Sequence, residues 1–141
     1  MLTKGCEYAI RAAVLLTHKM SDGRQYVPVR EIADELEISF HFLTKLLQIL
    51  TEAGIMMSFR GPNGGVALAR KPSQIRVREI VVAIDGEDIF KSCVLGLPQC
   101  GNDSPCPLHR EWAQRREQID RMFERATLAK LARGIGELNL K

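Results

Sequence analysis

The sequence predicts a mainly α-helical protein with one small β-ribbon and a long C-terminal helix. Apolar residues recur at helical spacing over residues 4–19, 29–36, 40–53 and 75–85. Two short β-type segments, 55–59 and 66–69, flank a glycine-rich turn, and another amphipathic stretch runs from 107 to about 131. Aromatic residues make up only 6% of the chain, which argues against an all-β sandwich.

Length and composition indicate one globular domain, or one domain with an added arm. The chain has 141 residues, of which 45% are hydrophobic and 26% charged, so it is long enough to bury its own core. No apolar run approaches the length of a membrane span. Lys4, Glu7 and Arg11 interrupt the segment where a signal peptide would be apolar. We therefore expect a cytoplasmic protein without membrane contact.

The helices of the first half have local start and stop signals. Ser21-Asp22-Gly23 breaks the first apolar stripe, and 37–39 forms a turn after the second. Ser39 has the right side chain and position for the N-cap of the third helix, which ends at Gly54. Helix, turn, helix and ribbon together are the order of a winged helix-turn-helix domain.

This order predicts a DNA-binding role for the third helix. Residues 27–36 would form the supporting helix and 39–50 the recognition helix, whose N-terminal side chains reach base edges in a major groove. The expected contacts on this helix are Ser39, Phe40, His41, Thr44 and Lys45.

The ribbon predicts a second DNA contact at its tip. Arg60 stands beside the glycine-rich turn, where a thin loop would fit a narrow minor groove. Gly61, Gly64 and Gly65 would let the backbone approach phosphates closely, and Asn63 is a further expected contact at this tip. No acidic residue occurs between Glu52 and Glu79, and residues 1–78 carry 11 Lys and Arg against 7 Asp and Glu. This local basic charge suits a polyanion, although a solvated surface would have the same pattern.

Three of the four cysteines lie within 14 residues, in a segment without periodicity. Cys93, Cys100 and Cys106 precede His109, and this set of thiols and imidazole suits either zinc or an iron–sulfur cluster. Cys106 also lies at a helix start, which favours its thiolate. Cys6 stands apart, and we interpret it as a small buried residue.

The sequence resembles the Rrf2 family of winged-helix transcription regulators over nearly its whole length. The most specific motifs are Tyr8-Ala9 with Arg11, Ile32-Ala33, the ribbon sequence 60–69 and the three cysteines before a long helix. The resemblance implies a homodimer that binds a partly palindromic operator in double-stranded DNA. It also implies one iron–sulfur cluster per protomer, bound by the three clustered cysteines.

The resemblance leaves the fourth cluster ligand open. In one branch of the family it is a histidine, which matches His109; in another it is an acidic residue from the first helix of the partner, which matches Glu7. A [2Fe-2S] cluster is favoured, and a [4Fe-4S] cluster is the alternative. The chain departs from the family in having Val66 where a wing aromatic is usual.

The predicted organisation has three parts: a winged helix-turn-helix domain at 1–85 with its wing at about 55–70, a cysteine loop at 86–106, and a dimerisation helix with its tail at 107–141. A helix over 107–131 would be about 37 Å long. We expect it to pair with a second copy, the alternative being that it folds back on its own domain.

The predicted function is a regulator, not an enzyme, whose cluster senses iron–sulfur status, redox state or nitric oxide. One alternative is a winged-helix regulator with a structural zinc site of three cysteines and His109. The other is a protein-interaction or redox module that uses a reactive cysteine.

Overall fold

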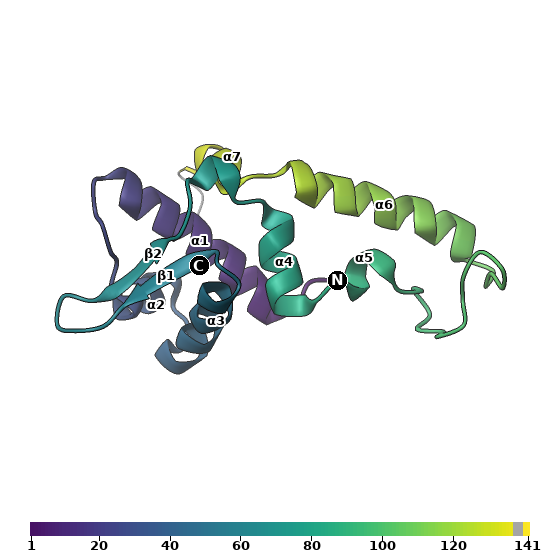
Figure 1. The fold of residues 1–141 in the computed structure, drawn as a ribbon, viewed down its shortest axis with the longest axis horizontal. Helices are drawn as coiled ribbons and strands as arrows, with labels where there is room; N and C mark the ends of the chain where they lie inside the picture. The colour runs from purple at the N-terminus through teal and green to yellow at the C-terminus, as the bar shows by residue number, and fades with distance from the viewer. Residues whose placement is uncertain (137–139) are drawn as a thin grey trace.

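A computed structural model describes residues 1–136 and 140–141 (Figure 1). It confirms the predicted fold class: helices with one two-stranded antiparallel sheet. The elements in chain order are α1 (Lys4–Ser21), α2 (Val29–Leu36), α3 (Phe40–Glu52), β1 (Met56–Phe59), β2 (Gly65–Leu68), the 3-10 turn η1 (Pro72–Gln74), α4 (Val77–Asp85), α5 (Asp88–Lys91), α6 (His109–Arg125) and α7 (Leu128–Ile135).

Helix α1 is the centre of the hydrophobic core. It contacts α2, α3, β2, α4 and α7, and its middle part is buried along nearly its whole circumference. Alanines at 9, 12 and 13 let these neighbours approach closely, because a small side chain keeps the helix axes near each other. A second, smaller apolar cluster joins Cys6, Val77, Val81 and Phe90.

The turn between α2 and α3 confirms the predicted helix boundaries. Glu37 ends α2 in the left-handed conformation (φ 56°), and the backbone N–H of Ile38 donates to the carbonyl of Ala33 at 3.0 Å. The Ser39 hydroxyl accepts from the N–H of Phe42 at 3.4 Å, so Ser39 caps α3 as expected.

The β-ribbon is tied to the start of α2. Residues 56–59 pair with 65–68, and Val27 and Val66 exchange two backbone hydrogen bonds of 2.9 Å. A Cβ at Gly65 would lie 2.3 Å from the Val27 carbonyl oxygen, and one at Gly64 would lie 2.2 Å from that of Phe59. These two glycines are therefore required by the ribbon itself.

The expected single helix over 107–131 is wrong in its C-terminal part. Helix α6 ends at Arg125, and Ala126 is extended because it pairs with the start of α4: the N–H of Val77 donates to its carbonyl at 2.8 Å. The N–H of Leu128 donates to the Ile75 carbonyl at 3.0 Å, and Thr127 caps α7. Helix α6 is thus about 26 Å long rather than 37 Å.

The chain after α6 folds back on the body. Leu128 and Ala132 of α7 are buried in the core beside α1, whereas α6 extends away from the body (Figure 1). The wing and the cysteine loop lie at opposite ends of the molecule (Figure 1). Among the described residues, no helix is long and apolar enough to cross a membrane.

Candidate metal centre and DNA-binding surface

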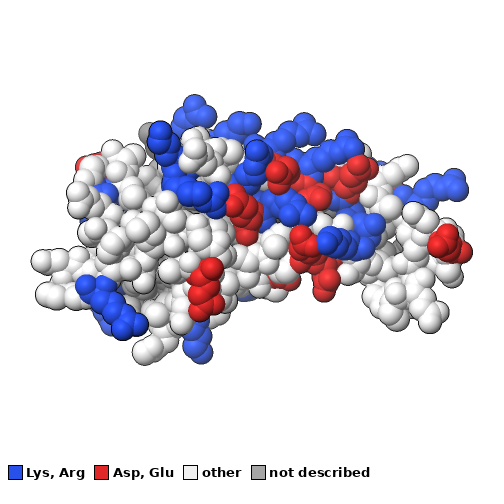
Figure 2. All heavy atoms as spheres, in the orientation of Figure 1, with Lys and Arg blue, Asp and Glu red and all other residues white. Residues whose placement is uncertain are grey.

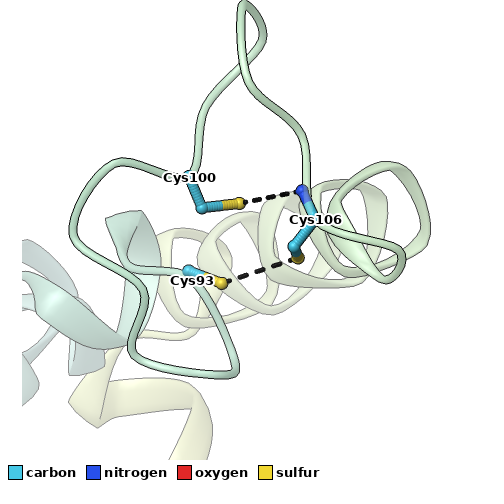
Figure 3. Close-up of side chains that lie close together, drawn as sticks. All are labelled: Cys93, Cys100 and Cys106. Atoms are coloured by element: carbon cyan, nitrogen blue, oxygen red, sulfur yellow. Dashed lines mark hydrogen bonds between the residues drawn. The ribbon is translucent and has the colours of Figure 1, made fainter.

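The loop between α5 and α6 brings three cysteines together (Figure 3). The Sγ atoms of Cys93, Cys100 and Cys106 all lie within 4.8 Å of one another. Cys93 Sγ is 3.7 Å from Cys106 Sγ, and the backbone N–H of Cys106 donates to Cys100 Sγ at 3.4 Å. The three are free, half-buried thiols outside the main core. This is the arrangement that a metal or cluster needs from three separate parts of a loop.

Helix α6 fixes the beginning of this loop. The indole Nε1–H of Trp112 donates to the Ser92 carbonyl at 2.9 Å, and the Arg116 guanidinium donates to the same carbonyl at 3.0 Å. Ser92 directly precedes Cys93, so these two bonds set where the first thiol lies. Sequence reasoning missed this role, because Trp112 and Arg116 appear in the sequence only as members of an amphipathic helix.

Cys93 and Cys100 differ in the direction of their pKa shifts. Backbone N–H groups of Leu97 and Leu95 lower the pKa of Cys93 to about 7, with smaller contributions from the other two thiols. The N–H of Cys106 lowers the pKa of Cys100, but desolvation and the neighbouring thiols outweigh it and raise that pKa overall. Cys93 is therefore the more readily available thiolate of these two.

His109 lies beside the three cysteines, at the first residue of α6. Its Nδ1 is 3.2 Å from Cys100 Sγ, and its Nε2 is 3.2 Å from Asn102 Oδ1. The amide oxygen of Asn102 thus orients the ring, as an outer partner commonly does for a ligating histidine.

The alternative fourth ligand, Glu7, and the remaining cysteine, Cys6, both lie on α1. The Glu7 carboxylate pairs with Lys4 at 2.8 Å and Arg11 at 3.9 Å, and it is not part of the cysteine group. Cys6 is fully buried, as expected, and burial followed by the nearby Asp85 raises its pKa to about 12.

Helix α3 presents most of the expected DNA contacts to solvent. Ser39, His41, Thr44 and Lys45 are exposed. Phe40 differs, because it is half-buried and packs against the main core. Gln48, one turn beyond Thr44, is also exposed and was not among the expected residues.

The wing and α3 enclose a groove of about 460 Å³. Thr44 and Gln48 line it from α3, and Ser58 and Arg60 line it from the ribbon. Arg60, Gly61 and Asn63 are exposed at the tip of the ribbon, whereas Gly64 is half-buried. Of the expected contacts, Thr44 and Arg60 therefore face the same groove.

The basic stretch before Glu79 is largely neutralised in space. Its arginines pair with carboxylates of α4 and α6: Arg70 with Glu79, Arg76 with Glu124 and Arg78 with Asp120. Among the residues that the structure describes, Arg60 makes no ion pair. Figure 2 shows further Lys and Arg side chains along the edge formed by α6 and α7, interleaved with acidic ones beside α6.

Comparison with known proteins establishes the family. The Rrf2 family of iron-dependent transcriptional regulators matches residues 2–134. This chain belongs to the Rrf2 family. The Rrf2 protein described here is 31% identical over 130 residues to the HTH-type transcriptional regulator IscR of Yersinia pseudotuberculosis, covering 92% of this chain and 77% of IscR.

Solved structures of regulators have the same fold. CymR, the global cysteine regulator of B. subtilis, superposes with a TM-score of 0.77 at 22% identity, covering 94% of this chain and 96% of CymR. IscR of T. potens gives a TM-score of 0.75 at 23% identity, covering 95% and 87%. The predicted family is confirmed, and the Rrf2 protein is a transcriptional regulator, not an enzyme. Double-stranded DNA is its partner class at the level of the family.

Proposed function

We propose that this Rrf2 protein acts in the cytoplasm and that its affinity for an operator depends on an iron–sulfur cluster held by Cys93, Cys100 and Cys106. The observation that carries this proposal is the approach of the three sulfurs to within 4.8 Å. Cysteine thiolates are the usual ligands of such clusters, so the donor set fits. A bound cluster would supply a centre sensitive to iron–sulfur status, redox state or nitric oxide.

The geometry favours His109 as the fourth ligand and hence a [2Fe-2S] cluster. Its ring already lies 3.2 Å from Cys100 Sγ, and Asn102 orients it. Glu7 would have to come from the partner and to exchange its ion pairs with Lys4 and Arg11. The partner's Glu7 with a [4Fe-4S] cluster is thus the second arrangement to test.

Contacts of Arg78 supply a route from the loop to the DNA-binding body. The guanidinium donates from Nε to Asp120 of α6 at 2.5 Å and lies 4.8 Å from the ring centre of Phe90 in α5. Arg78 itself is on α4, which follows the wing. Rearrangement of the loop would therefore shift α5 and α6 against α4, and through α4 the two recognition helices of a dimer.

The proposed homodimer pairs through α6. None of its side chains, all of which are described, is fully buried within the protomer, and Met122 is 57% exposed. A dimer would set two α3 helices about 34 Å apart, one turn of DNA.

The test begins with anaerobic purification and measurement of iron, sulfide, zinc and absorbance on one sample. Matching iron and sulfide is expected, with two or four per protomer deciding the cluster type. Cys93→Ala should remove the absorbance and the cluster-dependent part of operator binding. Cys6→Ala is the matched control, because Cys6 is buried outside the loop, and it should retain both. Unchanged iron content and DNA affinity in Cys93→Ala would contradict the proposal.

One distance favours zinc as the second candidate. Cys93 Sγ and Cys106 Sγ are 3.7 Å apart. Two thiolates on one tetrahedral zinc are about 3.8 Å apart, given a Zn–S distance of about 2.3 Å. A colourless protein with one zinc per protomer would establish this structural site and would leave DNA binding in place.

A further inference from the structure

Arg30 is held against the first residue of the recognition helix. The guanidinium carbon lies 4.4 Å from the ring centre of Phe40. This is within the range of a cation–π contact, which extends to about 6 Å. Phe40 is itself fixed, because it packs against the core and its ring centre lies 5.6 Å from that of His41 in an edge-to-face arrangement. The long and otherwise flexible Arg30 side chain thus has a preferred position beside the start of α3.

The charge of Arg30 is not neutralised by the acidic residues of its own helix. Asp34 stands one turn further along α2, yet no ion pair of Arg30 occurs within 4.0 Å among the described residues. The other two acidic residues of α2 form ion pairs with residues of α1 and of the loop that follows α1. Glu31 pairs with Lys19 and Arg24, and Glu35 pairs with Lys19. Arg30 therefore presents an exposed, uncompensated charge.

The start of α2 lies between the two elements expected to contact DNA. Val27 is hydrogen-bonded to the ribbon at Val66, and Val29 lines the groove together with Thr44 and Arg60. Arg30 follows directly. In helix-turn-helix proteins the supporting helix crosses the DNA backbone while the recognition helix enters the groove.

We propose that Arg30 binds a phosphate of the operator backbone and that the Phe40 ring holds its guanidinium in place for this contact. Phe40 then acts as a positioning residue rather than as the base-reading residue expected from the sequence. Phosphate contacts fix register and orientation without carrying sequence information. The inference rests on operator binding by this Rrf2 protein and assigns one more residue to it.

The test measures DNA binding against salt concentration for Arg30→Met and Arg30→Lys. The Met variant keeps apolar contact with Phe40 but removes the charge. It should weaken operator and unrelated DNA by the same factor and reduce the slope of log affinity against log salt by about 0.9 per bound protomer. The Lys variant should retain the slope. Arg133→Met, an exposed arginine on α7, is the matched control and should bind as the wild type does.

Three outcomes would overturn the assignment. The first is Arg30→Met with wild-type affinity and slope. The second is equal weakening of the Met and Lys variants with an unchanged slope, which indicates that the charge of Arg30 does not contact a phosphate. The third is weakening confined to the operator, which indicates a base contact. If the wild type itself shows no salt-dependent DNA binding, operator binding fails, and that result is distinct from these three.

Discussion

At the scale of single residues, the wing depends on positions that have no room for a side chain. Gly64 and Gly65 face carbonyl oxygens of Phe59 and Val27 at distances that a Cβ cannot occupy. The sequence suggests that these glycines let DNA phosphates approach. In the structure these glycines are needed first for the fold, because they allow the turn to close and the ribbon to pair with the segment before α2.

Gly65→Ala should destabilise the protein by about 1–3 kcal/mol, because the new methyl group overpacks against the Val27 carbonyl. Urea unfolding measures this change. Gly134→Ala is the control, since nothing lies within 4 Å of a Cβ there and the residue is inside α7. That variant should gain about 0.5–1 kcal/mol from helix propensity. Equal stability of the two variants would contradict the close approach.

Glu31 makes the stability depend on pH. Hydrogen bonds from Arg24 and then Lys19 lower its pKa to about 2, below the ordinary 4.5. The folded state therefore favours the carboxylate, so its contribution is complete above pH 4.5 and is lost as the pH falls towards 2. Because the side chain is 34% exposed, solvent screening limits the contribution to about 1 kcal/mol.

Glu31→Gln should remove that part of the pH dependence. Chemical unfolding at pH 6 and pH 3 in low salt measures the difference. Glu52→Gln, an exposed change on α3, should leave the wild-type dependence intact. A wild type and a Glu31→Gln variant that lose equal stability between these two pH values would show that the ion pairs contribute nothing.

At the scale of elements, the sequence predicts what local signals determine. The bounds of α2, the cap at Ser39 and the two-stranded ribbon follow from periodicity and turn residues close by in the chain. The end of α6 is less evident, because Ala126 favours a helix and only Thr127, a residue suited to an N-cap, marks a break nearby. The break depends on pairing of these two residues with the start of α4, some 50 residues earlier. The cysteine group was predictable as a set, whereas its anchoring by Trp112 depends on a contact across the fold.

The contact between α4 and α6 should carry the response of DNA binding to the loop. Arg78→Met removes the ion pair with Asp120. Metal content should stay the same, while the ratio of DNA affinities with and without metal should fall towards one. Arg70→Met is the control, because Arg70 pairs with Glu79 of α4 and not with α6. The DNA affinity of this variant should still change when the metal is removed. DNA titrations before and after metal removal measure this ratio of affinities. A wild-type ratio in Arg78→Met would show that the contact between α4 and α6 does not link the loop to DNA binding.

At the scale of the whole molecule, the protein is elongated and its two candidate functional regions lie far apart. The wing and α3 lie at one end, and the cysteine loop lies at the other, on an arm made mostly of α6 (Figure 1). An arm with no fully buried side chain gains little from folding alone. A second copy packed along α6 would bury this surface. It would also connect the cysteine loop of each copy, through the paired helices, to the wing and α3 of both copies.

Met122→Glu should therefore convert the proposed dimer into a monomer, because it places a charge on the exposed apolar part of α6. Analytical ultracentrifugation over a range of concentrations measures the change. Met57→Glu is the matched control, since Met57 is a similarly exposed methionine, 44%, on the ribbon and not on α6. Only the variant on α6 should dissociate, and its operator affinity should fall with it, because a single half-site forms fewer contacts than two. A Met122→Glu protein that stays dimeric would place the interface elsewhere and remove α6 as the link between the two loops.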